Sequence, residues 1–162
     1  MKLHCFTSCK NGNKILVKYL GEKGADINKK SLYYETPLFL ACEDGNEDLM
    51  KYLVDHITDM DKVINKKYQE GNILLIIATL ERKINLVKYL IEHRANVNLS
   101  NDHHSTPLTL ESEYREKEIV KYLLEHGADA HAKNNDGASS LKIACTLHFP
   151  EIEQLLQYSA QY

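Results

Sequence analysis

The sequence predicts an all-α solenoid, in which helix-turn-helix units stack on one another and are joined by β-hairpin-like loops. The five letters LVKYL, or a close variant, occur four times, and their tyrosines are spaced by 33, 37 and 33 residues. A spacing in this range is typical of solenoid repeats, in which each repeat is one small structural unit. We expect a single domain over residues 1–162, with repeats at about 1–30, 31–67, 68–100, 101–133 and 134–162.

Each repeat is expected to contain a short first helix. Thr36 and Thr106 directly precede Pro37 and Pro107. Threonine is a good N-cap, and proline is tolerated at the first helical position because its missing N–H has no partner there. The apolar residues that follow each proline are therefore expected to lie on a helix that faces the core.

The LVKYL segments are expected to form the second helices. Apolar residues recur in an i, i+1, i+4, i+5 stripe, for example at Leu86, Val87, Leu90 and Ile91. One helix pair cannot bury both apolar faces, so copies must stack into a continuous core. Lysines with an acidic residue four positions later, such as Lys88, predict a neutralised, solvated outer face rather than a nucleic-acid site.

One spacing of 37 residues indicates a four-residue insertion. The segment DHITDMDKVIN, at residues 55–65, carries it, between a second helix and the following hairpin. Repeat ends are marked by the dipeptides IN, IN and VN, which finish at Asn28, Asn65 and Asn98.

The repeat resembles the ankyrin repeat over essentially the whole chain. The letters TPL at 36–38 and 106–108, the small pairs Ala-Cys or Ala-Thr, the apolar second helix and GAD at 24–26 and 127–129 occur at that family's offsets. The resemblance implies a binding scaffold, with partners contacting hairpin tips and first helices on the concave side. Asn28, with Leu20 and Asp26 before it, also resembles a site that asparaginyl hydroxylases accept.

The family's binding positions, carried over to this sequence, define the expected partner-binding residues. They are Lys30, Leu32, Tyr33, Glu35, Glu43, Asp44, Lys67, Gln69, Glu70, Asn72, Leu80, Glu81, Ser100, Asp102, His103, Ser105, Glu113, Tyr114, Lys133, Asn135 and Asp136. Aliphatic and aromatic groups usually dominate interfaces, so four of these are the expected anchors. The four are Leu32, Tyr33, Leu80 and Tyr114.

Charges among these residues predict the kind of partner. Lysines gather at the hairpin tips, whereas the first helices carry acidic residues such as Glu43, Glu81 and Glu113. A groove with an acidic floor and a partly basic rim suits a partner segment of mixed or basic charge. The alternative is that these charges only keep the protein soluble.

Several turns depart from the family pattern, which places glycine where φ is positive. The residues that replace glycine are Tyr34, Arg82, Arg94, His104, Arg115 and His148. Each non-glycine residue at such a turn costs on the order of 1 kcal/mol. We therefore expect the third and fourth repeats to be the least stable part of the array.

Glu111 is a sharper departure, because other repeats have Ala41, Ala78 or Ala144 at this tightly packed position. A carboxylate cannot lie unpaired in a core. We expect either a displaced helix in the fourth repeat, or a Glu111 side chain that reaches solvent or a partner such as Arg115. A functional contact of Glu111 is the alternative.

Composition and motifs limit the function classes. The net charge is −3, and the sequence contains no membrane-length apolar run, Gly-rich phosphate loop, nucleophile elbow or HExxH motif. We therefore expect a non-enzymatic protein–protein interaction module, without cofactor, metal, nucleic acid or membrane. Four cysteines without framework spacing favour a reducing compartment. We expect a cytoplasmic monomer, with the nucleus as the alternative location. The alternative function is a purely structural unit, either a fragment of a longer array or an engineered scaffold.

Overall fold

The structure is a computed structural model. It describes residues 13–27, 31, 35–57 and 61–159. The chain divides into two compact units, Met1–Val63 and Ile64–Tyr162, which are described separately below. The single domain over residues 1–162 stays a prediction.

The first unit contains the helices α2 (Lys14–Glu22), α3 (Pro37–Glu43) and α4 (Glu47–Asp55). The α4 helix packs against both α2 and α3. The Thr36 Oγ1 atom accepts a hydrogen bond of 3.1 Å from the N–H of Phe39, and Pro37 is the first helical residue, as predicted. The helical turn α5 (Asp61–Ile64) lies in the segment where the insertion was predicted; the first unit ends within it, at Val63, and Ile64 belongs to the second unit.

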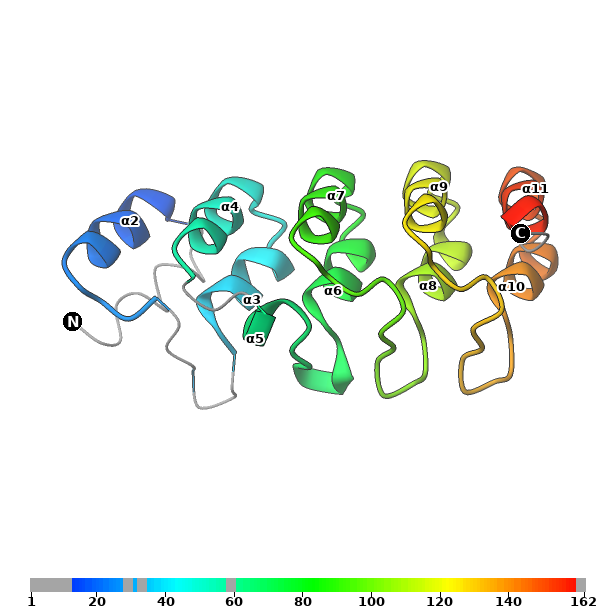
Figure 1. The fold of residues 1–162 in the computed structure, drawn as a ribbon, viewed down its shortest axis with the longest axis horizontal. Helices are drawn as coiled ribbons and strands as arrows, with labels where there is room; N and C mark the ends of the chain where they lie inside the picture. The colour runs from blue at the N-terminus through cyan, green and yellow to red at the C-terminus, as the bar shows by residue number, and fades with distance from the viewer. Residues whose placement is uncertain (1–12, 28–30, 32–34, 58–60, 160–162) are drawn as a thin grey trace. The chain divides into compact units, whose positions relative to one another are not determined.

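The second unit consists of helix pairs in the predicted order. The elements are η1 (Gln69–Gly71), α6 (Leu74–Leu80), α7 (Ile84–Glu92), α8 (Pro107–Tyr114), α9 (Lys117–Glu125), α10 (Ser140–Leu147) and α11 (Pro150–Ser159). First helices α6, α8 and α10 pack side by side, and second helices α7, α9 and α11 form an adjacent row (Figure 1). The hairpin loops project from the side of the first helices (Figure 1). This arrangement is the predicted all-α solenoid of helix pairs.

The core of the second unit comes from the stripe read in the sequence. Leu86, Val87 and Leu90 of α7 are fully buried, and the equivalent Val120 and Leu123 of α9 are buried as well. Because the same positions recur in each second helix, the apolar face continues from one repeat to the next.

Asparagine side chains connect consecutive repeats. The Asn98 Oδ1 atom accepts a hydrogen bond of 2.8 Å from the N–H of Asp129, and its Nδ2 donates one of 2.9 Å to the carbonyl of Gly127. Asn65 makes the same pair of bonds with the N–H of Asn96 and the carbonyl of Arg94. Each asparagine therefore bonds to the turn that follows the second helix of the next repeat.

Positive φ at the non-glycine turns is confirmed wherever the structure describes them. The values are 54° at Arg82, 70° at Arg94, 56° at His104, 64° at Arg115 and 59° at His148. Tyr34 lies outside the described residues. Glu70 also has positive φ, at 55°. The sequence did not predict this, because this repeat keeps a hairpin glycine, Gly71, which has positive φ as well.

Two of these arginines make a compensating contact. The guanidinium of Arg82 lies 5.1 Å from the ring centre of Tyr114, and that of Arg115 lies 5.5 Å from the ring centre of Phe149. Cation–π contacts at exposed sites contribute about 0.5–1 kcal/mol. The contact therefore offsets part of the strain that a glycine would avoid.

The expectation that the Glu111 side chain reaches solvent or a partner such as Arg115 was wrong. Its residue is 0% exposed, and both carboxyl oxygens lack a hydrogen-bond partner. Helix α8 keeps its Thr106 cap, since the Thr106 Oγ1 atom accepts from the N–H of Thr109 at 3.2 Å, so the helix begins where the repeat predicts. Burial is the main cause that raises the pKa of Glu111 from 4.5 to about 8; the charge of Glu116 contributes to the rise and that of Arg82 opposes it. A neutral acid is far less costly to bury than a carboxylate.

A tilted Tyr–His ring pair recurs at the second helices. Tyr89 and His93 lie 4.1 Å apart between ring centres, and Tyr122 and His126 lie 4.0 Å apart. Lys121 pairs with Glu125 at 3.7 Å as the spacing predicts. In contrast, the ion pair of Lys88 is with Glu118 of the next repeat, at 2.9 Å.

In the described part of the chain, every helix is too short or too polar to cross a bilayer.

Candidate partner-binding surface

Most of the residues predicted to bind a partner are exposed. In the first unit, these are Glu43 and Asp44. In the second unit, the exposed or half-buried ones lie on the hairpins and first helices. We call them the hairpin–helix surface: Lys67, Gln69, Glu70, Asn72, Leu80, Glu81, Ser100, Asp102, His103, Glu113, Tyr114, Lys133, Asn135 and Asp136.

The remaining predicted residues fall elsewhere. Lys30, Leu32 and Tyr33 lie outside the described residues, so two of the four expected anchors have no structural description. Glu35 is half-buried in the first unit, where its Oε2 accepts a hydrogen bond of 3.1 Å from the Ser31 hydroxyl. Ser105 is buried, and its N–H donates to the Asn101 Oδ1 atom at 3.0 Å. Its position is inside the hairpin rather than on the surface.

Backbone hydrogen bonds connect neighbouring hairpin tips in the second unit. The N–H of Asp102 donates to the carbonyl of Glu70 at 2.9 Å, and the N–H of Asn135 donates to the carbonyl of His103 at 3.0 Å. The Asn101 Nδ2 atom also donates to the Asn72 Oδ1 atom at 3.1 Å. Because each tip is bonded to the next, side chains on the tips are held in a common frame, which lowers the entropy lost on binding.

Gly71 allows the first of these tip-to-tip contacts. A Cβ atom at Gly71 would lie 2.7 Å from the backbone nitrogen of Asp102, and closer still to its carboxyl group. Its φ of 70° is also in the region that favours glycine. The glycine at this hairpin is therefore required both by the backbone conformation and by the neighbouring tip.

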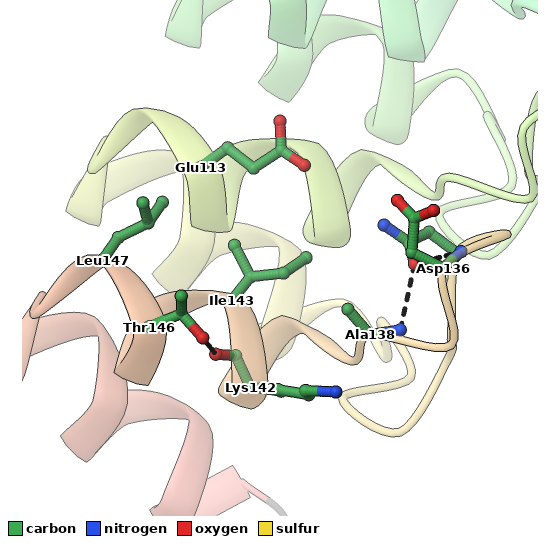
Figure 2. Close-up of a pocket in the computed structure, with 8 residues that line it drawn as sticks. Glu113, Asp136, Ala138, Lys142, Ile143, Thr146 and Leu147 are labelled. Carbon is green, nitrogen blue, oxygen red and sulfur yellow. Dashed lines mark hydrogen bonds between the residues drawn. The ribbon is translucent and has the colours of Figure 1, made fainter.

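A pocket lies between α8, α10 and the hairpin before α10 (Figure 2). Its volume is about 360 Å³, and its lining residues are Glu113, Asn134, Asp136, Ala138, Lys142, Ile143, Thr146 and Leu147. Ile143 is buried and Leu147 is 44% exposed, so the wall from α10 is apolar. Glu113 and Asp136, from two different elements, bring carboxylates to the rim (Figure 2).

The Asp136 carboxylate acts on the carboxyl group of Glu113. Partial burial raises the pKa of Glu113, and the negative charge of Asp136 adds to the rise. The Asp136 backbone N–H donates to the Asn134 Oδ1 atom at 3.1 Å, which holds the tip in a tight turn. The arrangement can accept a cation or a hydrogen-bond donor at the rim and an apolar group along the wall.

Sequence reasoning missed the part of this pocket that α10 contributes. Ile143, Thr146 and Leu147 were not among the predicted residues, although Thr146 and Leu147 share the repeat positions of Glu113 and Tyr114. The register alone could have identified them. They were missed because only hairpin residues of the fifth repeat were carried over.

Within the part of the chain that the structure describes, no cluster of three or more His, Cys, Asp or Glu residues could hold a metal ion.

A family model described as "Ankyrin repeats (3 copies)" matches residues 5–101, 58–134 and 75–162, which together cover nearly the whole chain. No curated protein matches the chain.

Proposed function

Since the chain belongs to the ankyrin-repeat family, whose members generally mediate protein–protein interaction, we propose that it binds a protein partner through the hairpin–helix surface. The observation that carries this proposal is the set of tip-to-tip hydrogen bonds, from Asp102 to Glu70 and from Asn135 to His103. They hold exposed polar and aromatic side chains in a fixed frame beside the first helices. A preorganised surface of this kind loses little entropy on binding.

Of the two expected anchors that the structure describes, Tyr114 is the more exposed. It is 39% exposed, and the Arg82 guanidinium lies 5.1 Å from its ring centre. Tyrosine and arginine are enriched among residues that dominate binding energy. Leu80, half-buried on α6, offers a second apolar contact in the preceding repeat. We propose that these residues form the centre of the contact in the second unit.

The proposed role is that of a non-enzymatic scaffold, because family members are generally non-enzymatic. The proposed partner is a polypeptide segment of mixed or basic charge, since Glu81, Glu113 and Asp136 are exposed and acidic on this surface. A monomer in the cytoplasm is the form in which we propose that the protein acts.

Site-specific photo-crosslinking tests the proposal with a matched control. The photoreactive residue p-benzoylphenylalanine replaces either Tyr114 on the first helix α8 or Tyr122 on the second helix α9. Both are tyrosines of the same repeat, so the two proteins differ mainly in the face that carries the probe. We expect a crosslinked partner from position 114 and none from position 122 in cell lysate. Crosslinking from position 122 alone would place the partner on the outer face and reject the proposal.

A further inference from the structure

We propose that the pocket between α8, α10 and the preceding hairpin binds an arginine side chain of the protein partner. This inference rests on the proposed function, because it assigns a partner chemistry to one part of the hairpin–helix surface. It depends on three observations: the apolar wall, the two rim carboxylates and, within the described part of the chain, the lack of a cation that pairs with these carboxylates.

The apolar wall matches the stem of an arginine. Ile143 and Leu147 of α10 and Ala138 of the hairpin line the pocket, and its volume of about 360 Å³ exceeds that of one side chain. Arginine buries its three methylene groups against apolar surface while its charged head stays near polar groups. An acidic or short polar side chain would leave this wall in contact with water.

The rim carboxylates match the guanidinium head. Glu113 approaches from α8 and Asp136 from the hairpin, so acceptors are present on two sides of the pocket (Figure 2). A guanidinium has five donors in a planar fork and can engage two separate carboxylates, whereas an ammonium is a compact, strongly hydrated charge. The geometry therefore favours arginine over lysine.

Among the described residues, the cation that lines the pocket does not occupy the rim between Glu113 and Asp136. Lys142 also lines the pocket, but its amine lies beside the hairpin and apart from both carboxylates (Figure 2). Among the described residues, neither Glu113 nor Asp136 takes part in an ion pair. The negative charge of Asp136 raises the pKa of Glu113, and a bound cation would relieve this repulsion.

The acidic pair belongs to this pair of repeats. One repeat earlier, the positions of Glu113 and Asp136 are occupied by Leu80 and His103. The same place between the third and fourth repeats therefore has an apolar residue and a histidine. An arginine at one point of a partner segment would thus fix the segment's register along the second unit.

Two small probes measure this binding in the full chain without knowledge of the partner. The probes are N-acetyl-arginine methylamide and its neutral isostere N-acetyl-citrulline methylamide, each titrated while the NMR signals of Ile143 and Leu147 are recorded. We expect the arginine probe to shift these signals and to bind about fivefold more tightly than the citrulline probe. In the Glu113→Gln/Asp136→Asn double variant, we expect this difference to disappear.

The control variant is Glu92→Gln, which removes an exposed acidic side chain from the second helix α7. It should retain the wild-type preference for arginine, and circular dichroism should show all variants folded. Equal binding of both probes, an unchanged preference in the double variant, shifts located elsewhere, or no shift with either probe would each overturn the pocket assignment. Crosslinking from position 114 does not depend on the pocket, so its success alongside such a result would reject the arginine pocket and leave the proposed function standing.

Discussion

The second helices and the hairpin–helix surface of residues 64–162 differ in how closely they repeat. Helices α7 and α9 present the same buried stripe and the same tilted Tyr–His pair, with distances between ring centres of 4.1 and 4.0 Å. First helices α6 and α8 instead differ at the packed position, where Ala78 becomes Glu111, and two residues later, where the half-buried Leu80 becomes the exposed Glu113. The repeated face performs the same structural task in each copy, whereas the varied face is where one repeat can be distinguished from another.

The largest expected effect comes from Glu111, the strongest departure from the repeat in the core beneath the varied face. Its pKa is 4.5 when exposed and about 8 in the fold, so the folded state binds an extra proton between these values. The contribution of Glu111 to the free energy of unfolding is therefore fully present below pH 4.5. It falls by about 1.4 kcal/mol per pH unit above pH 4.5 and stops changing above pH 8. Glu111→Gln should remove this slope and stabilise the protein at pH 8.5 by up to about 5 kcal/mol, measured by urea unfolding.

Two outcomes would sharpen or reject this account of Glu111. The Glu92→Gln variant, which changes an exposed residue of α7, should keep the wild-type dependence on pH. A wild-type protein whose stability does not change between pH 5 and pH 8.5 would mean that Glu111 is ionised and solvated, contrary to its burial.

The next effect tests the close approach of the hairpin tips. Gly71→Ala places a Cβ atom against Asp102 in a backbone with φ of 70°, so we expect a loss of about 2 kcal/mol in the free energy of unfolding. Gly137→Ala is the matched control, because its φ is 71° but no atom lies within 4 Å of the added Cβ. It should cost about 1 kcal/mol, from backbone conformation alone. Equal losses in thermal unfolding would show that the tips do not approach as described.

The asparagine bridges come third. Asn98→Ala removes the hydrogen bonds to the N–H of Asp129 and the carbonyl of Gly127. Both bonds are exposed and join uncharged groups, so we expect a loss of about 1 kcal/mol in the free energy of unfolding. Asn98→Asp keeps the acceptor for the Asp129 N–H but loses the donor, so a smaller loss is expected. If chemical unfolding shows the two variants equally destabilised, the Nδ2 donor rather than the Oδ1 acceptor carries the bridge.

The smallest effect compares two equivalent turns after second helices. Arg94 has φ of 70° where the next repeat has Gly127, at 83°. Arg94→Gly relieves the backbone strain but increases the entropy of the unfolded chain, so a net gain of about 0.5 kcal/mol is expected. Gly127→Arg should lose a similar amount, since no atom lies within 4 Å of a Cβ there. Changes of the same sign in both variants, seen by differential scanning calorimetry, would contradict the equivalence of the turns.

Local sequence rules predicted the features that depend on neighbours in the chain. The Thr106 cap, the buried stripe of Leu86, Val87 and Leu90, and the positive φ at Arg82 all follow from residue type and spacing. These features were predictable because a repeat imposes the same local geometry in each copy.

Features that depend on contacts between repeats were not predictable in this way. The pairing of Lys88 with Glu118, the stacking of Arg82 on Tyr114 and the pocket wall from α10 each join residues about 30 positions apart. The burial of Glu111 was missed because its carboxyl group becomes neutral only when the packed environment raises its pKa. Sequence reasoning assumed a charged carboxylate and therefore expected solvent access.

The most direct test of the central claim measures partner affinity for two surface variants of the full chain. One variant carries Leu80→Ala and Tyr114→Ala on the hairpin–helix surface, and the other carries Lys88→Ala and Lys121→Ala on the second helices. With the partner identified by crosslinking, calorimetric titration should show a loss of about tenfold or more for the first variant and wild-type affinity for the second. Wild-type affinity in the first variant together with a loss in the second would contradict the claim that the varied face binds the partner.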